Sequence, residues 1–198
     1  MEAFSDGVFA IAITLLVLEI GVPSGSEDDL LTAVVDQWPS YLAYLVSFAT
    51  IGAVWIEHTV VTEYLDRATS VLIRLNLLLL MMVALLPFPT RLLGEYIGAD
   101  EPERIAVTIY GLNLFLISAL VSLLWRYAVR ERLIRPDAAD TDVRMITKRL
   151  TPGLAGYVAV IVLGLFLPVL AVLGYLAIAV YVIVPFGALR RRAAAAPE

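Results

Sequence analysis

The sequence predicts an all-α, polytopic membrane protein with six transmembrane helices and no soluble domain. Of its 198 residues, 61% are hydrophobic and 17% are charged, and the mean hydropathy is +0.88. These values lie far outside the composition of soluble globular domains. Apolar runs of about 20 residues, the length that crosses a bilayer, recur along the chain. The absence of cysteine excludes disulfide frameworks and thiolate metal sites.

The first apolar run, 4–22, is interpreted as a mature spanning helix and not as a signal peptide. The residues before and within its start include Glu2 and Asp6 in place of Lys or Arg, and the run continues through Leu18 without a small-residue cleavage site. The breaker-rich and acidic segment 23–29 then predicts a linker.

Three further spanning helices are predicted at 38–61, 71–93 and 104–129, with a charged linker at 98–103. The last apolar block is nearly twice one bilayer crossing and has Pro168 near its middle, which predicts two short antiparallel helices, 153–167 and 169–189. We therefore expect one transmembrane domain, 1–189, followed by a short basic cytoplasmic tail, 190–198.

Basic residues predict the orientation, because cytoplasmic loops next to spanning helices accumulate Lys and Arg. Of the 14 basic residues, all but Arg91 and Arg104 fall on one side of the predicted topology. Both termini are therefore expected in the cytoplasm, in the cell membrane. The opposite side is acidic and would attract cations, although acidic loops also serve simply to keep an outer surface soluble. Its carboxylates are Glu27, Asp28, Asp29, Asp36, Glu95, Asp100, Glu101 and Glu103.

The first helix has two different faces. At about 100° per residue, an uncharged face lies within about 60° of Ile11, and Ser5 and Asp6 fall on the far side. The uncharged face comprises Phe4, Gly7, Val8, Ile11, Thr14, Leu15, Leu18 and Val22. An uncharged face would also be expected if these residues simply contacted lipid or packed in the core.

An ionisable residue in a membrane segment is a functional or structural site by default. His58 and Arg74 are predicted at the same depth as Asp6, so we expect Asp6 to bond one of them, with Ser5 and Trp55 in the same polar layer. Alternatively, Asp6 reaches water at the inner interface. No second His is present to build a metal site with His58, and a pH-sensing role for His58 stays open.

The segment Phe4-Ser5-Asp6-Gly7-Val8-Phe9-Ala10-Ile11 matches a Phe-Ser-Asp-x-x-x-Ala-Ile motif. With Trp55-Ile56-Glu57-His58, Leu75-Asn76-Leu77 and Leu86-Pro87-Phe88-Pro89-Thr90, it makes the chain similar to the transmembrane protein 175 family, which contains the lysosomal potassium channel and prokaryotic relatives. The family usually has an Arg four residues before the Phe, a position ahead of residue 1, and Arg74 is the candidate to replace it. Glu57 also departs from the family, where a His is common.

The resemblance implies a homotetramer of six-helix subunits in which the first helix lines a central cation pore. Ile11 then corresponds to the narrowest hydrophobic constriction, Leu15 and Leu18 to further apolar rings, and Thr14 to a position linked to potassium preference. Phe4, Ser5, Asp6, Trp55, His58 and Arg74 would anchor the helices. No cofactor, metal or nucleic acid is implied; the partners are further copies and the bilayer, and potassium is the permeant ion.

We therefore expect a potassium-permeable channel with modest preference for potassium over sodium, and not an enzyme. A carbonyl-lined filter like Thr-Val-Gly-Tyr-Gly is absent, so a hydrophobic gate would carry the constriction. A cation or proton exchanger would need a midplane carboxylate, for which Glu19 is the first-helix candidate besides Asp6. An intramembrane hydrolase lacks its catalytic groups in this sequence. A non-conducting membrane scaffold is the remaining alternative.

Overall fold

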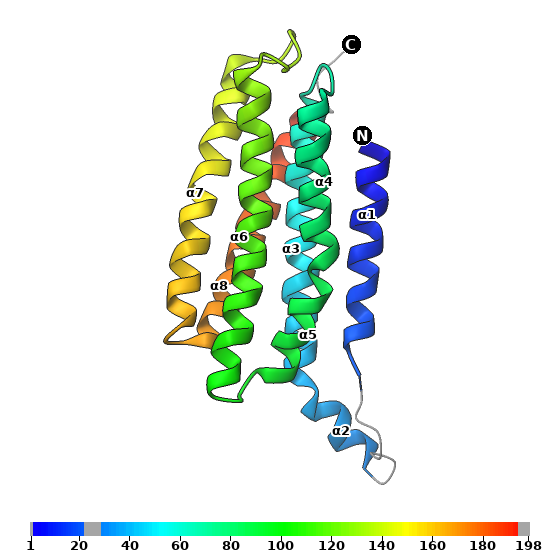
Figure 1. Ribbon diagram of the computed structural model, residues 1–198, viewed down its shortest axis with the longest axis vertical. Helices are drawn as coiled ribbons and strands as arrows, with labels where there is room; N and C mark the ends of the chain where they lie inside the picture. The colour runs from blue at the N-terminus through cyan, green and yellow to red at the C-terminus, as the bar shows by residue number, and fades with distance from the viewer. Residues whose placement is uncertain (1, 22–28, 194–198) are drawn as a thin grey trace.

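The computed structural model describes residues 2–21 and 29–193, and these residues are helical apart from turns and one isolated antiparallel bridge, Leu65 to Ile134. The order is α1 (Glu2–Leu15), the 3-10 helix η1 (Leu16–Glu19), α2 (Leu30–Asp36), α3 (Trp38–Glu63), α4 (Ser70–Leu85), α5 (Pro87–Tyr96), α6 (Glu101–Arg130), α7 (Asp140–Gly164) and α8 (Pro168–Ala193). Figure 1 shows an elongated bundle with α1 at one edge and α7 at the other. The all-α class is confirmed.

Prolines set several helix boundaries. Proline lacks a backbone N–H, and in the first turn of a helix this group would have no intrahelical hydrogen-bond partner. Pro39 and Pro102 lie in the first turns of α3 and α6, and Pro168 is the first residue of α8. Pro87 follows Leu86 where α4 passes into α5, so these two helices form one apolar segment, Ser70–Tyr96, with a joint.

The predicted count of six spanning helices is not confirmed. Within the described residues, four helical segments are long and apolar enough to cross a membrane, Trp38–Glu63, Ser70–Tyr96, Glu101–Arg130 and Asp140–Gly164. The first helix is shorter than the predicted 4–22, because its α-helical hydrogen bonding ends at Leu15 and a 3-10 helix follows; Val22 lies outside the described residues. The described apolar part of α8, Pro168–Val184, is also short.

The start of α7 differs most from the prediction, which placed it at residue 153. The helix begins at Asp140, because an amphipathic stretch precedes the apolar block: Ile146 and Leu150 are buried while Arg144 and Lys148 are exposed. The Trp125 indole donates to Thr147 Oγ1 at 2.8 Å, which fastens this stretch to α6. Likewise, α8 continues to Ala193, beyond the predicted end at 189, and the rest of the predicted tail, 194–198, lies outside the described residues.

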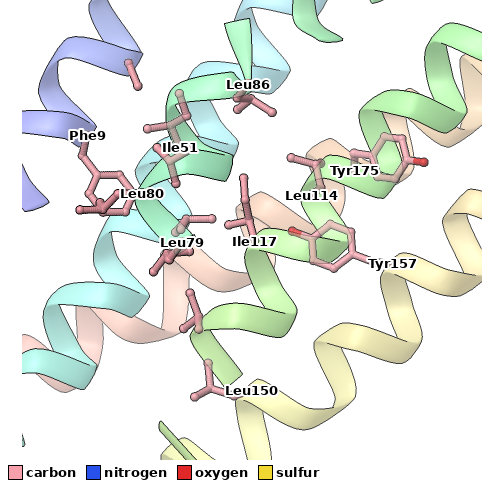
Figure 2. Packing of buried hydrophobic residues seen from close by; sticks show 14 of the residues in the cluster. Phe9, Ile51, Leu79, Leu80, Leu86, Leu114, Ile117, Leu150, Tyr157 and Tyr175 are labelled. Atoms are coloured by element: carbon pink, nitrogen blue, oxygen red, sulfur yellow. The ribbon is translucent and has the colours of Figure 1, made fainter. Parts of the chain in front are cut away.

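The hydrophobic core extends along the whole bundle (Figure 2), from Phe9 on α1 through Leu79 on α4 and Leu114 on α6 to Tyr157 on α7 and Tyr175 on α8. Helix α1 packs in the groove between α3 and α4. This leaves α1 at the edge of the bundle, where one of its faces is covered and the other is not.

Candidate pore helix and its anchoring layer

Along their whole length, α1 and η1 have one buried face and one exposed face. Ser5, Phe9, Ala12 and Leu16 are at most 3% exposed. On the other face, Phe4 is 63%, Ile11 61%, Leu15 41% and Leu18 72% exposed. The chain therefore presents a row of large apolar side chains that its own bundle does not cover.

Thr14 lies on the exposed side of α1, between Ile11 and Leu18. Its hydroxyl donates to the Ile11 carbonyl oxygen at 2.8 Å. Because the proton is used within the helix, the hydroxyl oxygen keeps its lone pairs available as an acceptor. A cation can therefore approach this oxygen without first breaking that hydrogen bond.

The covered face of α1 is fastened by a chain of buried side chains from α1, α4 and α3. Asn76 Nδ2 donates to Ser5 Oγ at 3.0 Å, and Asn76 Oδ1 accepts from His58 Nε2 at 2.8 Å. All three residues are at most 2% exposed. Since the Asn76 oxygen cannot donate, His58 carries its proton on Nε2.

Asp6 has a different partner from the one expected. Its Oδ1 accepts from the Trp55 indole N–H at 2.8 Å, so the expected bond to His58 or Arg74 is wrong. Ser5, on the buried side of α1, is the residue that meets the α3–α4 groove, and Asp6, about 100° further round, reaches Trp55 on α3. His58 is instead held by Asn76, a residue of the Leu75-Asn76-Leu77 motif for which the sequence predicted no role.

Arg74 and Phe4 do not enter this layer within the single chain. Arg74 is exposed, and Phe4 is 63% exposed. Arg74 and Asn76 are two residues apart on α4, about 200° around the helix, so they cannot face α1 together. The signal for Asn76 in the sequence is a carboxamide inside a run of leucines, where an unpaired polar group would be costly.

His58 has no metal-binding neighbours in the described part of the chain, where no group of three or more His, Cys, Asp or Glu side chains could hold an ion. Its ring lies 5.4 Å from the Phe9 ring at an interplanar angle of 50°. Nδ1 of His58 is buried without a hydrogen-bond partner among the described residues. The arrangement suits a neutral imidazole that fastens helices.

A second buried polar cluster, which the sequence analysis missed, joins α3, α5 and α6. Ser47 Oγ lies 2.8 Å from Thr90 Oγ1 and 3.0 Å from the Tyr110 hydroxyl. Thr90 is the last residue of the Leu86-Pro87-Phe88-Pro89-Thr90 motif. Ser47 and Tyr110 are isolated polar residues in apolar helices, and such residues do not indicate in the sequence that they meet. The cluster holds α5 against α3 and α6.

Glu57 points to the other side of α3 from Trp55, since the two positions are about 200° apart. Its carboxylate interacts electrostatically with Arg149 on α7, and the Arg149 guanidinium lies 5.9 Å from the centre of the Tyr181 ring on α8. Glu57 is therefore part of the α3, α7 and α8 packing and lies away from α1.

The end of the bundle where α1 stops contains a cavity of about 670 Å³. Leu18 and Glu19 line it from η1, Asp36 and Gln37 from the end of α2, and Arg91 and Glu95 from α5. Three carboxylates against one guanidinium give this cavity a negative charge next to the exposed face of α1.

The chain is similar to known proteins over most of its length. The family model described as endosomal/lysosomal potassium channel TMEM175 matches residues 1–87. A protein named potassium channel from Streptomyces collinus is 42% identical over 159 residues, 79% of this chain and 77% of the relative. One of the same description from Chamaesiphon minutus is 44% identical over 161 residues, 78% of each chain.

Animal relatives are matched over a smaller share of their length. The endosomal/lysosomal proton channel TMEM175 of Gallus gallus is 36% identical over 138 residues, 65% of this chain and 28% of that protein. The names of the relatives therefore cover both potassium and proton channels.

Solved structures show the same fold. A crystal structure of a lysosomal potassium-selective channel TMEM175 homologue from Chamaesiphon minutus superimposes with a TM-score of 0.85, at 37% identity, over 93% of this chain and 95% of the other. A variant of the potassium channel MtTMEM175 superimposes with a TM-score of 0.64 at 22% identity, over 96% of this chain and 92% of the other. At this identity the likeness shows the fold alone. With two relatives above 40% identity matched over more than three quarters of their length, the chain belongs to the TMEM175 family and is a membrane protein.

Proposed function

We propose that this chain is a potassium-permeable channel of the cell membrane in which four copies surround a central pore lined by α1. The observation that carries the proposal is the exposed apolar face of α1, which the subunit leaves uncovered although it fastens the opposite face with buried hydrogen bonds. The potassium channels among the relatives support the choice of ion. The family comprises ion channels, a class distinct from enzymes.

In this proposal α1 with η1, together with α8, completes a set of six crossings. Helix α1 begins and α8 ends at the same end of the bundle (Figure 1), as an even number of crossings requires. Arg67, Arg130, Arg132 and Arg135 lie in or beside the turns at this end, which supports a cytoplasmic location. The cavity bounded by Glu19, Asp36 and Glu95 then belongs to the outer mouth, where its charge would concentrate cations.

Ile11 forms the constriction in this proposal, with Leu15 and Leu18 as further apolar rings. A narrow ring of aliphatic side chains gates by losing its water. The Thr14 oxygen, one turn from Ile11, offers partial replacement of the hydration shell and gives a modest preference for potassium. We expect Thr14→Val to reduce the potassium-to-sodium permeability ratio, and Thr14→Ser, which keeps the oxygen, to retain it.

The test is recording of the purified protein in planar bilayers under potassium, sodium and proton gradients. A current that needs no counter-ion is expected, with potassium above sodium. Ile11→Asn should raise the open probability or conductance several-fold because a polar side chain wets the constriction. Val162→Asn on the exposed side of α7 is the matched control.

Each other outcome points to a different function. Flux that depends on an exchanged ion indicates an exchanger, and the absence of any current indicates a scaffold. A current carried by protons and not by potassium would place the chain with the relatives named proton channels. Unchanged behaviour of Ile11→Asn would remove Ile11 from the constriction.

A further inference from the structure

Helix α2 is an amphipathic helix whose apolar side chains the subunit does not cover. Leu30 is 59%, Leu31 77%, Val34 36% and Val35 61% exposed. At about 100° per residue these four side chains span an arc of about 140°, the α2 face, and Thr32 and Asp36 lie outside it. The adjoining Trp38, the first residue of α3, is also 53% exposed.

Helix α2 is held by contacts at its C-terminal end. The Tyr41 hydroxyl donates to the Val34 carbonyl oxygen at 2.9 Å, and Ser40 Oγ donates to Gln37 Oε1 at 3.3 Å. Asp36 and Gln37 line the acidic cavity of their own subunit. These contacts fix the C-terminal end of α2 on the bundle, while the four apolar side chains of the α2 face stay exposed.

The position of α2 indicates what covers this face. In Figure 1, α2 projects past the end of α1 at the edge of the bundle that α1 forms, opposite the edge formed by α7. If the α1 edge faces the pore axis, this region is where neighbouring subunits meet, and lipid surrounds the α7 edge. This placement of α2 rests on the proposed tetrameric channel.

Charge argues against the bilayer as the occupant. Helices that lie on membranes carry Lys and Arg on their polar side. The described segment 29–37 has no basic residue, and its charged residues are Asp29 and Asp36. Beyond the spanning segments, an apolar face of four aliphatic side chains would stand in water, and burying such a face favours association.

We propose that α2 is a docking element for a second copy of this chain: the α2 face packs on the outer end of the neighbouring subunit and ties the subunits together around the pore mouth. Helix α2 lies outside the four apolar spans, so in this proposal the contact forms in water and the hydrophobic effect stabilises it directly. Packing within the bilayer lacks this driving force.

The first test places a photoreactive p-benzoylphenylalanine at Leu31 of the full chain in liposomes. Illumination is expected to give an adduct of twice the subunit mass, and peptide mapping then locates the surface contacted on the neighbour. The same probe at Val162 on α7, 50% exposed, is the matched control and should react with lipid. Lipid adducts alone at Leu31 would overturn the proposal in favour of the membrane surface.

The second test compares two double variants. One carries Leu31→Ser and Val35→Ser on α2, and the control carries Val158→Ser and Val162→Ser on α7. Because the α2 side chains are exposed within the subunit, thermal unfolding of the monomer should not change. Tetramer dissociation, measured by mass photometry in detergent, should rise at least about tenfold for the α2 pair only. Equal dissociation of both variants would refute docking through α2.

The unsubstituted protein separates this proposal from the proposed function. A tetramer that conducts potassium but gives no Leu31 adduct between chains rejects the docking role alone. A monomer without current rejects both.

Discussion

Asn76 uses both ends of its amide to join three helices, with Ser5 on α1 and His58 on α3 as partners. Replacement by Leu keeps the volume but leaves the buried His58 N–H without an acceptor. We expect Asn76→Leu to lower stability by about 1–2 kcal/mol, seen as a lower unfolding temperature in detergent. Leu78→Ala, at a 47% exposed position on the same helix, is the control. An unfolding temperature equal to that of the control would mean that the layer does not hold α1.

The division of α1 into two faces could be predicted because it depends on the angular spacing of residues within one helix. The partner of Asp6 could not, because it depends on how α1 sits between α3 and α4. Trp55 and His58 are three residues apart on α3 and both face α1, so a small rotation decides which of them Asp6 meets. The sequence places residues at a common depth but does not specify this rotation.

At the scale of whole helices, the approach of α8 to α6 depends on Gly111. A Cβ at this position would overlap the Tyr175 hydroxyl and lie 2.8 Å from Ile161 Cγ1. Gly111→Ala should therefore destabilise the protein by about 1–3 kcal/mol, measured by thermal unfolding. Adding Tyr175→Phe removes the overlapping oxygen and should restore part of the loss. If the double variant is no more stable than Gly111→Ala, the clash with Tyr175 is not the cause.

The turns that follow α3 and α6 are held together by backbone hydrogen bonds, from Asp66 N to the Leu133 carbonyl and from Arg135 N to the Tyr64 carbonyl, both 2.9 Å. The Tyr64 hydroxyl also donates to Asp142 at 3.2 Å. Partial burial and, to a smaller extent, the nearby Asp142 carboxylate raise the pKa of Tyr64, so the hydroxyl stays protonated at neutral pH. The α3–α4 and α6–α7 turns therefore behave as one unit.

Hydrogen exchange measures this coupling. Amides 66 and 135 should exchange slowly although both lie in turns, because each is hydrogen bonded across the pair. Asp66→Pro removes one donor and should accelerate exchange of amide 135 as well. Ala139→Pro, at a position outside the paired residues where the φ of −67° suits proline, is the control. Unchanged exchange at amide 135 in Asp66→Pro would show that the turns open independently.

Helices α2 and the first turns of α7 show where element prediction from the sequence stops. Each spanning segment has a long apolar run, whereas these two stretches are short or mixed in polarity, so hydropathy assigns them to loops. What makes α7 begin at Asp140 is burial of Ile146 and Leu150 against α6. That burial exists only once the helices have packed.

For the whole molecule, the orientation can be checked because the chain has no cysteine of its own. Ala99→Cys lies in the α5–α6 turn and Glu131→Cys in the α6–α7 turn, both at exposed positions. In intact cells, a membrane-impermeant maleimide should label Ala99→Cys only, and lysis should expose Glu131→Cys. The reverse pattern would place the basic end outside.

The change of helix type at Leu16 has a geometric consequence for the proposed pore. A 3-10 helix advances about 120° per residue, so Leu15 and Leu18 are eclipsed on one line along the axis. If η1 adopted α-helical hydrogen bonds, three residues would advance only about 300°, and Leu18 would turn about 60° away from Leu15. Each residue would also rise about 0.5 Å less, shortening the segment by about 2 Å. In the proposed pore, one turn of hydrogen bonds would therefore set how many apolar rings an ion passes in line.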